Sequence, residues 1–231
     1  MSRGSTHYGE LPVSVVSMGG AYSDPDGTAP IDGVVRNACP PHITLRRGVN
    51  WAPGMGGERF VSTADAGRVM SAIRTLARQK PLHKSLLVCG KSSGGAKAWN
   101  TFRLHYNEIR GLFKRAALVL IDAHGTVRRD GHLAYSCTVD LWWPPNWPQN
   151  LRILRVYNIF QQLHPRNLPR RGERWANTIT GAAFDEASRD RLAMHVDLTQ
   201  ERNAPHHMEI VHHQRTSEVL RAAFRFTVWG T

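Results

Sequence analysis

The chain has 231 residues, of which 41% are hydrophobic and 21% charged, a length and balance typical of one globular domain with a sizeable core. Its 30 Lys and Arg residues outnumber 18 Asp and Glu residues, which gives a formal net charge of +12, but the basic residues are spread along the chain without a nucleic-acid-binding motif. We therefore expect a basic solvated surface and no specific nucleic-acid binding.

The apolar segments and the cysteines of the chain bear on its cellular compartment. No apolar run approaches the ~20 residues that a membrane-spanning helix needs, and the first ten residues lack the apolar core of a signal peptide. The three cysteines, Cys39, Cys89 and Cys137, have spacings that fit neither a disulfide framework nor a zinc site. These features predict a cytoplasmic protein without a transmembrane segment, kept in a reducing compartment.

The first 80 residues predict a strand, a long loop and a helix. Residues 11–18 have the β-branched content of a strand, and the paired glycines Gly19 and Gly20 follow it. Residues 30–60 are rich in Gly and Pro and predict a long irregular loop. A capping-box-like pattern then opens a helix expected over residues 62–79.

The stretch 86–95 carries the strongest signal for chemistry. Four apolar residues predict a buried strand, the pattern Gly-x-Ser-x-Gly follows at residues 90–94, and a helical pattern begins at once. This order is typical of a nucleophile elbow, in which a strained turn exposes a serine hydroxyl, here that of Ser92, above a helix N-terminus. The alternative is an ordinary turn whose small residues relieve crowding. A phosphate-binding P-loop is excluded because it needs glycine at position 85, which is serine.

The next strand, expected over residues 115–121, is a continuous apolar run typical of a parallel strand covered on both faces. It ends at Asp122, which places an acid at the edge where open α/β sheets carry their chemistry. Residues 128–150 then form a long insertion with three tryptophans among prolines: Trp142, Trp143 and Trp147. We expect these rings to line the binding site of an apolar substrate, with a partner-binding surface as the alternative.

The C-terminal part continues the alternation of strands and helices. Strands are expected over residues 151–160 and 193–198, a short helix over 184–192, and a last helix from about residue 216. The order predicts a single α/β domain over residues 1–231 with a mostly parallel sheet. A serine nucleophile needs a base, usually histidine, and four histidines before the last helix are candidates: His206, His207, His212 and His213.

Together these motifs resemble the α/β-hydrolase superfamily, in its lipase and esterase-like branch. The specific matches are the elbow serine, the Asp that ends the next strand, Asn-x-x-Gln at residues 158–161 and His-x-x-Ile at residues 207–210. The resemblance implies a three-layer sandwich, with Ser92 as nucleophile, His207 as base and Asp122 as the acid that orients the base.

The chain departs from the pattern of this superfamily in two places. Lys91 stands where histidine or tyrosine is common, and the strand ending near Asn158 lacks the acid that many hydrolases carry after it. The second departure favours Asp122 as the acid, with Asp140 as second choice.

The implied activity is that of a serine hydrolase that cleaves carboxylic esters through an acyl-enzyme. Its oxyanion hole would combine the backbone N–H of Ser93 with one from Gly19 or Gly20. No metal or organic cofactor is expected, and the expected partner is a small-molecule or lipid-like ester. Two alternatives stay open: a non-catalytic binding protein on the same scaffold, and an acyltransferase or peptidase with the same three residues.

Overall fold

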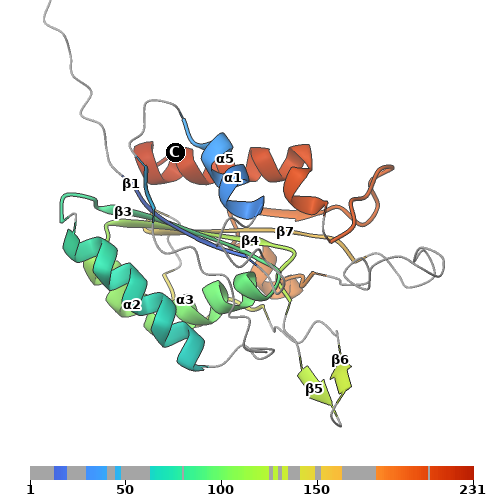
Figure 1. Ribbon diagram of the computed structural model, residues 1–231, viewed down its shortest axis with the longest axis horizontal. Coiled ribbons are helices and arrows are strands. Elements are labelled where there is room, and N and C mark those ends of the chain that lie inside the picture. Colours follow the sequence, from blue (N-terminus) through green and yellow to red (C-terminus); the bar gives the residue numbers. More distant parts are fainter. Residues whose placement is uncertain are drawn as a thin grey trace, which may run out of the picture.

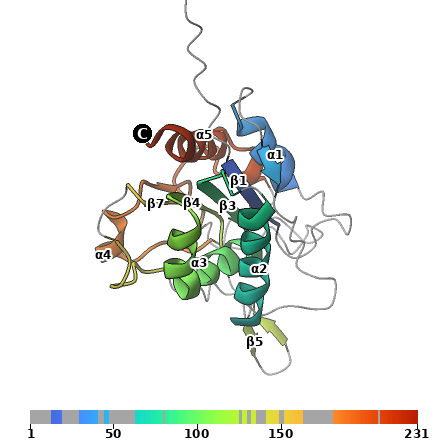
Figure 2. The same ribbon diagram turned by 90° about the vertical axis from the view of Figure 1, so that its left-hand side faces the viewer.

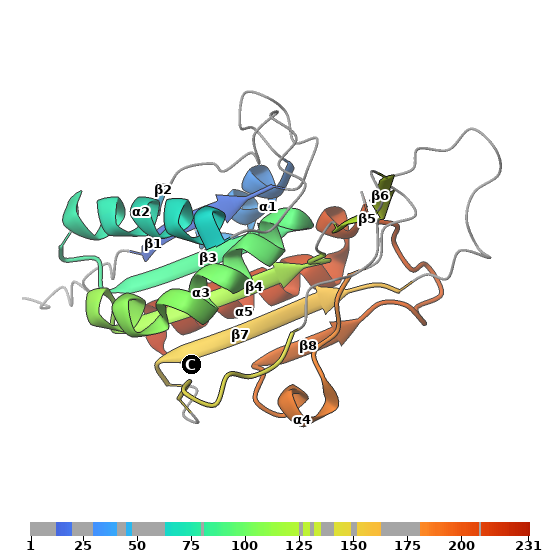
Figure 3. The ribbon, with the colours of Figure 1, turned by 90° about the horizontal axis from the view of Figure 1, so that it is seen from below.

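A six-stranded parallel sheet forms the centre of the computed structural model, which describes residues 13–19, 30–40, 45–47, 63–79, 81–124, 127–129, 132–134, 141–148, 152–162, 181–207 and 209–231. In spatial order the strands are β2 (Leu45–Arg47), β1 (Val13–Met18), β3 (Ser85–Lys91), β4 (Arg115–Ile121), β7 (Leu154–Phe160) and β8 (Met194–Asp197). Every neighbouring pair is parallel. The arrows of β3, β4, β7 and β8 therefore point to the same side in Figure 3.

Helices cover both faces of this sheet (Figures 1 and 2). One face carries α2 (Thr63–Gln79) and α3 (Ser93–Leu112), and the other carries α1 (Pro30–Ala38) and α5 (Gln214–Trp229). The predicted three-layer α/β architecture with a parallel central sheet is confirmed. Among the described residues, no helix is both long and apolar enough to cross a membrane.

Burial on both faces explains why the central strands are apolar without interruption. Alternate residues of β3 enter two different cores: Leu86 and Val88 pack toward α2 and α3, whereas Leu87 and Cys89 pack toward α1 and α5. A strand covered on both sides needs an apolar residue at every position, because successive side chains point to opposite faces.

The predicted loop over residues 30–60 is wrong in part, because α1 and β2 lie within it. Proline is tolerated at the first position of a helix, where its missing N–H would have no partner within the helix. Ile31, Val35 and Ala38 then form a buried stripe against the core under α5. These side chains are buried only because the sheet and α5 cover them, so the helix depends on tertiary packing.

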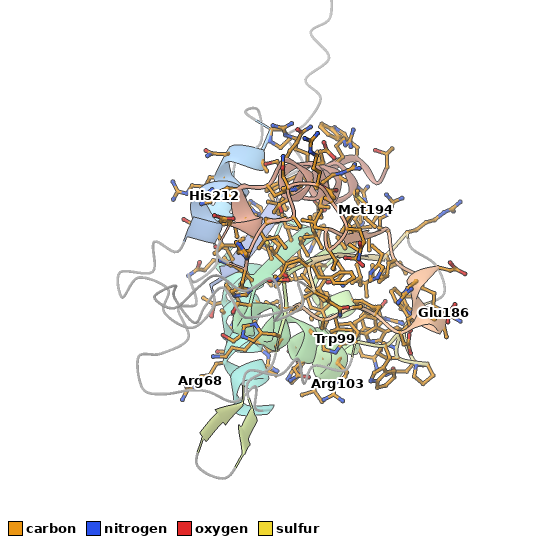
Figure 4. All side chains as sticks on the ribbon, turned by 90° about the vertical axis from the view of Figure 1, so that its right-hand side faces the viewer. Arg68, Trp99, Arg103, Glu186, Met194 and His212 are labelled. Carbon is orange, nitrogen blue, oxygen red and sulfur yellow. The ribbon has the colours of Figure 1, made fainter. Side chains whose placement is uncertain are left out.

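The remaining short elements lie among the connections between strands. The hairpin β5 (Val127–Arg129) and β6 (His132–Ala134) forms a separate two-stranded sheet, which begins one residue before the predicted insertion over residues 128–150. Helix α4 (Glu186–Arg189) precedes β8, and the 3₁₀ helix η3 (Ile210–His212) precedes α5. Figure 4 looks onto the side to which the strand arrows of Figure 3 point, with His212 of η3 and Trp99 of α3 on opposite sides of the sheet.

Candidate active site

Ser92 lies at the turn between β3 and α3 in a strained backbone conformation, with φ 60° and ψ −132°. Among the described non-glycine residues, only Ser92 and Asp122 have positive φ. Such outliers persist only where the surroundings impose them, and they cluster at functional sites. Here the backbone N–H of Ser92 donates to the carbonyl of Ile121 at 3.0 Å, and its carbonyl accepts from Gly95 at 2.9 Å. The turn is therefore tied to both the neighbouring strand and the helix.

The glycines around Ser92 are required by close backbone contacts. A Cβ on Gly90 would lie 2.5 Å from the carbonyl oxygen of Gly94 and 2.7 Å from the Cα of Gly95. A Cβ on Gly94 would overlap the carbonyl oxygen of Gly19, at the end of β1. The glycines at 90 and 94 thus allow strand, helix and the end of β1 to meet, which is the geometry of a nucleophile elbow.

Asp122 follows β4, the strand beside β3, and accepts three hydrogen bonds. Its Oδ2 receives Nδ1–H of His207 at 2.6 Å and the side-chain amide of Gln161 at 3.1 Å, and its Oδ1 receives the backbone N–H of Gln161 at 3.0 Å. Asp122 and His207 are 0% and 2% exposed. The carboxylate therefore fixes the ring of His207, leaving Nε2 as the nitrogen that can accept a proton.

The structure distinguishes the four histidines that the sequence left as candidates. Of these, His207 is the one that contacts Asp122. His212 is exposed, and His213 caps α5 through Nδ1 while its Nε2 lies 3.3 Å from Glu201. His206 is half-buried, and its Nδ1 has no hydrogen-bond partner among the described residues. Asp140, the second choice for the acid, lies outside the described residues.

A histidine that the sequence did not select, His124, also reaches the elbow. Its Nδ1 lies 3.2 Å from Oγ of Ser92, its backbone N–H donates to the carbonyl of Ser92 at 3.3 Å, and it is 2% exposed. Its ring meets that of His207 edge-on, with centroids 5.1 Å apart. Parallel pairing of Lys91 with Ile121 brings the residues after both strands to one level, which is the signal that could have indicated His124.

Two basic groups at the site are shifted toward their neutral forms. Burial, and next the neighbouring His207, lower the pKa of His124 to about 4, against an opposing effect of Asp122. Burial also lowers the pKa of Lys91 to about 8, although Asp122 acts in the opposite direction. At neutral pH the imidazole of His124 is therefore uncharged.

Two of the three residues expected at the oxyanion hole are described. Ser93 is the first residue of α3, directly after the elbow, and Gly19 lies against Gly94. Gly20 falls outside the described residues. Among the described side chains, no group of three or more His, Cys, Asp or Glu is placed to hold a metal ion.

The tryptophans of the insertion are packed mainly into the core beneath α3. Trp143 and Trp147 are 7% and 2% exposed, and the ring of Trp147 lies 5.2 Å from that of Trp99 and 5.6 Å from that of Tyr106. This packing accounts for both rings without a substrate. Trp142 is half-buried and is the remaining candidate of the three for contact with a ligand.

One known architecture combines the four features seen here: this strand order, a strained serine after β3, an acid after β4 and a histidine after the last strand. This is the α/β-hydrolase fold. The predicted fold is therefore confirmed by the strand order and by the positions of these three residues in this chain.

Comparisons with known proteins give likenesses in structure but not in sequence. No protein-family model and no curated protein matches the chain. The chain is similar to the NocB thioesterase domain from the nocardicin cluster, with 14% identity, a TM-score of 0.49, and 91% of this chain and 93% of that one covered. It is also similar to the RedJ thioesterase from the prodiginine pathway of Streptomyces coelicolor, with 14% identity, a TM-score of 0.45, and 91% of each chain covered. A third similar structure is Aspergillus fumigatus lipase B, with 16% identity, a TM-score of 0.45, and 85% of this chain and 47% of that one covered.

Proposed function

We propose that the protein is a serine hydrolase that cleaves carboxylic esters through an acyl-enzyme on Ser92. The observation that carries the proposal is the strained turn at Ser92 beside the buried pair of His207 and Asp122, joined at 2.6 Å. A binding protein gains nothing from a serine held at positive φ or from a buried, carboxylate-oriented imidazole. A serine hydrolase needs both.

In the proposed reaction, Oγ of Ser92 attacks the carbonyl carbon of the ester while Nε2 of His207 takes the hydroxyl proton. The carboxylate of Asp122 stabilises the imidazolium that forms. The tetrahedral intermediate collapses by breaking the bond to the alcohol oxygen, which receives the proton from His207. Water then repeats the sequence on the acyl-enzyme, releasing the acid and restoring the hydroxyl of Ser92.

The oxyanion of each tetrahedral intermediate would be bound by backbone N–H groups at the start of α3 and at the end of β1, with Ser93 and Gly19 as the candidates. A single donor of this kind contributes roughly 2.7–4 kcal/mol in a serine protease. The N-terminal end of α3 adds a favourable dipole at the same point.

The proposal is tested with a fluorophosphonate probe, which phosphonylates an activated serine without requiring knowledge of the substrate. We expect one labelled residue, Ser92, identified by peptide mapping, and no labelling of Ser92→Ala. The matched control is Ser71→Ala, which removes an exposed serine of α2 and should label like the wild type.

Hydrolysis of p-nitrophenyl acetate gives the second measurement. Ser92→Ala should lose turnover while keeping the thermal unfolding midpoint close to that of the wild type, because only one oxygen is removed. If the wild-type protein is neither labelled nor active, the protein is a binding module on this scaffold. Labelling at a serine other than Ser92 would transfer the nucleophile's role to that residue.

A further inference from the structure

The site contains two buried histidines, and the mechanism above uses only one of them. Oγ of Ser92 is hydrogen-bonded to Nδ1 of His124 at 3.2 Å, whereas Nδ1 of His207 is engaged with Asp122. The rings of His124 and His207 meet edge-on with centroids 5.1 Å apart, so the base of the proposed mechanism lies next to the imidazole that contacts Ser92. The imidazole that contacts the nucleophile is therefore His124, which is not the base of the proposed mechanism.

Position and burial show that the contact of His124 with Ser92 is built into the fold. His124 follows β4 by three residues, and its main chain is hydrogen-bonded to that of Ser92. Both side chains are nearly inaccessible, at 2% and 4% exposed, so water does not compete freely for the hydroxyl. A buried hydroxyl needs a partner, and in this arrangement that partner is His124.

We infer that His124 is a positioning residue that holds the hydroxyl of Ser92 in a resting hydrogen bond. In this state the O–H donates to Nδ1 of His124, and it must turn away before Nε2 of His207 can take its proton. The proton stays on Oγ of Ser92 throughout, so this step is a rotation that breaks the hydrogen bond to His124 and no covalent bond. The inference deepens the proposed hydrolase function, and its kinetic meaning rests on that function.

The charges around His124 favour the neutral imidazole that this bond requires. His207 faces it from the segment after the last strand, Asp122 precedes it on the same connection, and Lys91 faces it from the end of β3. Burial is the largest of the effects that lower the pKa of His124, and His207 and Lys91 act in the same direction. The charge of Asp122 and a hydrogen bond to its backbone raise that pKa, but they do not offset the decrease. A neutral ring can offer Nδ1 as an acceptor across the neutral pH range when its remaining proton is on Nε2, which is the tautomer that the inference requires.

The first test is ¹⁵N NMR of histidine-labelled protein at pH 7, which reports the protonation of each ring nitrogen independently of activity. We expect Nδ1 of His124 to be unprotonated and hydrogen-bonded, and Ser92→Ala to shift that resonance more than any resonance of His207. His124→Asn and His207→Asn assign the two sets of signals. A protonated Nδ1 on His124, or a Ser92→Ala effect confined to His207, would overturn the inference.

The second test measures the rate of fluorophosphonate labelling in two variants. His124→Leu keeps a side chain of similar volume but removes the acceptor, so the hydroxyl is released toward His207. We expect labelling to accelerate by about 2- to 12-fold, the factor that corresponds to losing one net hydrogen bond of ordinary strength. His124→Asn keeps a polar atom near the position of Nδ1 and should restore a rate close to that of the wild type.

The outcomes separate this inference from the proposed function. Slower labelling of His124→Leu would mean that His124 assists the attack, and equal rates in all three proteins would mean that the contact does not control the nucleophile. Either result overturns the resting bond while leaving Ser92 as a nucleophile. If the wild type is not labelled, the proposed function fails, and the NMR measurement still decides the contact. It also decides the contact if His124→Leu does not fold.

Discussion

Gly181 lies directly against the carboxylate of Asp122, and Gly181→Ala therefore tests whether that carboxylate controls the site. A Cβ at residue 181 would overlap Oδ1 of Asp122, and it would lie 2.8 Å from the Cβ of Phe160 and 2.9 Å from the Cα of Asp122. Carbon atoms in favourable contact are about 3.5–4.0 Å apart, so neighbouring atoms must move by roughly 0.6–1.2 Å.

The movement falls on a group that is held tightly. Asp122 receives hydrogen bonds from Gln161 at 3.0 and 3.1 Å and from His207 at 2.6 Å. Misplacing a catalytic group by about 1 Å can lower a rate about 100-fold. We expect Gly181→Ala to slow fluorophosphonate labelling of Ser92 by about that factor, and overpacking to lower the free energy of unfolding by about 1–3 kcal/mol.

The assay combines labelling kinetics with urea unfolding. Gly111→Ala is the matched control, because it replaces a glycine in helix α3 and its added Cβ meets no atom of the described residues within 4 Å. That variant should label normally and gain up to about 1 kcal/mol in unfolding free energy. A Gly181→Ala protein that labels at the wild-type rate would refute the role given to Asp122, whatever its stability.

Three further predictions concern two tryptophans of the insertion and the effect of pH. Trp147→Ala should lower the unfolding free energy by about 3–5 kcal/mol, since the ring is buried against Trp99 and Tyr106. Trp142→Ala should instead reduce kcat/KM for p-nitrophenyl octanoate more than for the acetate ester; an unchanged ratio would remove Trp142 from the acyl site. Because the pKa of His124 falls from 6.5 to about 4 on folding, the unfolded chain binds more protons between these values, and stability is lost as the pH falls through this range. The difference in unfolding free energy between pH 7 and pH 4.5 should be about 2–3 kcal/mol smaller in His124→Asn than in the wild type; equal differences would contradict the lowered pKa.

The sequence alone predicted those elements that are held by contacts between residues close together in the chain. The turn at Ser92 requires glycines at positions 90 and 94 because backbone atoms meet there, so the pattern of small residues alone indicates it. The run of residues 115–121 is apolar at each position after Arg115, and it became the central strand β4 with the predicted bounds. In both cases the pattern in the sequence consists of the same residues that form the turn or the strand.

Other features depend on partners that are far away in the chain. The 2.6 Å contact between His207 and Asp122 joins residues 85 positions apart, and Gln161 reaches the same carboxylate from the end of β7. The residues alone therefore left four histidines open, and His207 was selected only through the resemblance to a known superfamily; the structure brings His207 beside Asp122. His124 gained its place for the same reason, through the parallel register of β3 and β4.

Burial of side chains is likewise decided by tertiary packing. The tryptophans of the insertion could cover a substrate or a core, and composition does not distinguish the two. The structure buries Trp143 and Trp147 under α3, and it makes a helix of residues 30–38 because their apolar stripe meets the core beside α5. The sequence by itself determined the elbow and the central strands, through contacts between near neighbours. The residues without the resemblance left the histidine partner of the acid open, and only the tertiary structure showed that contact and which aromatic rings are core, because both depend on surfaces that different segments bring together.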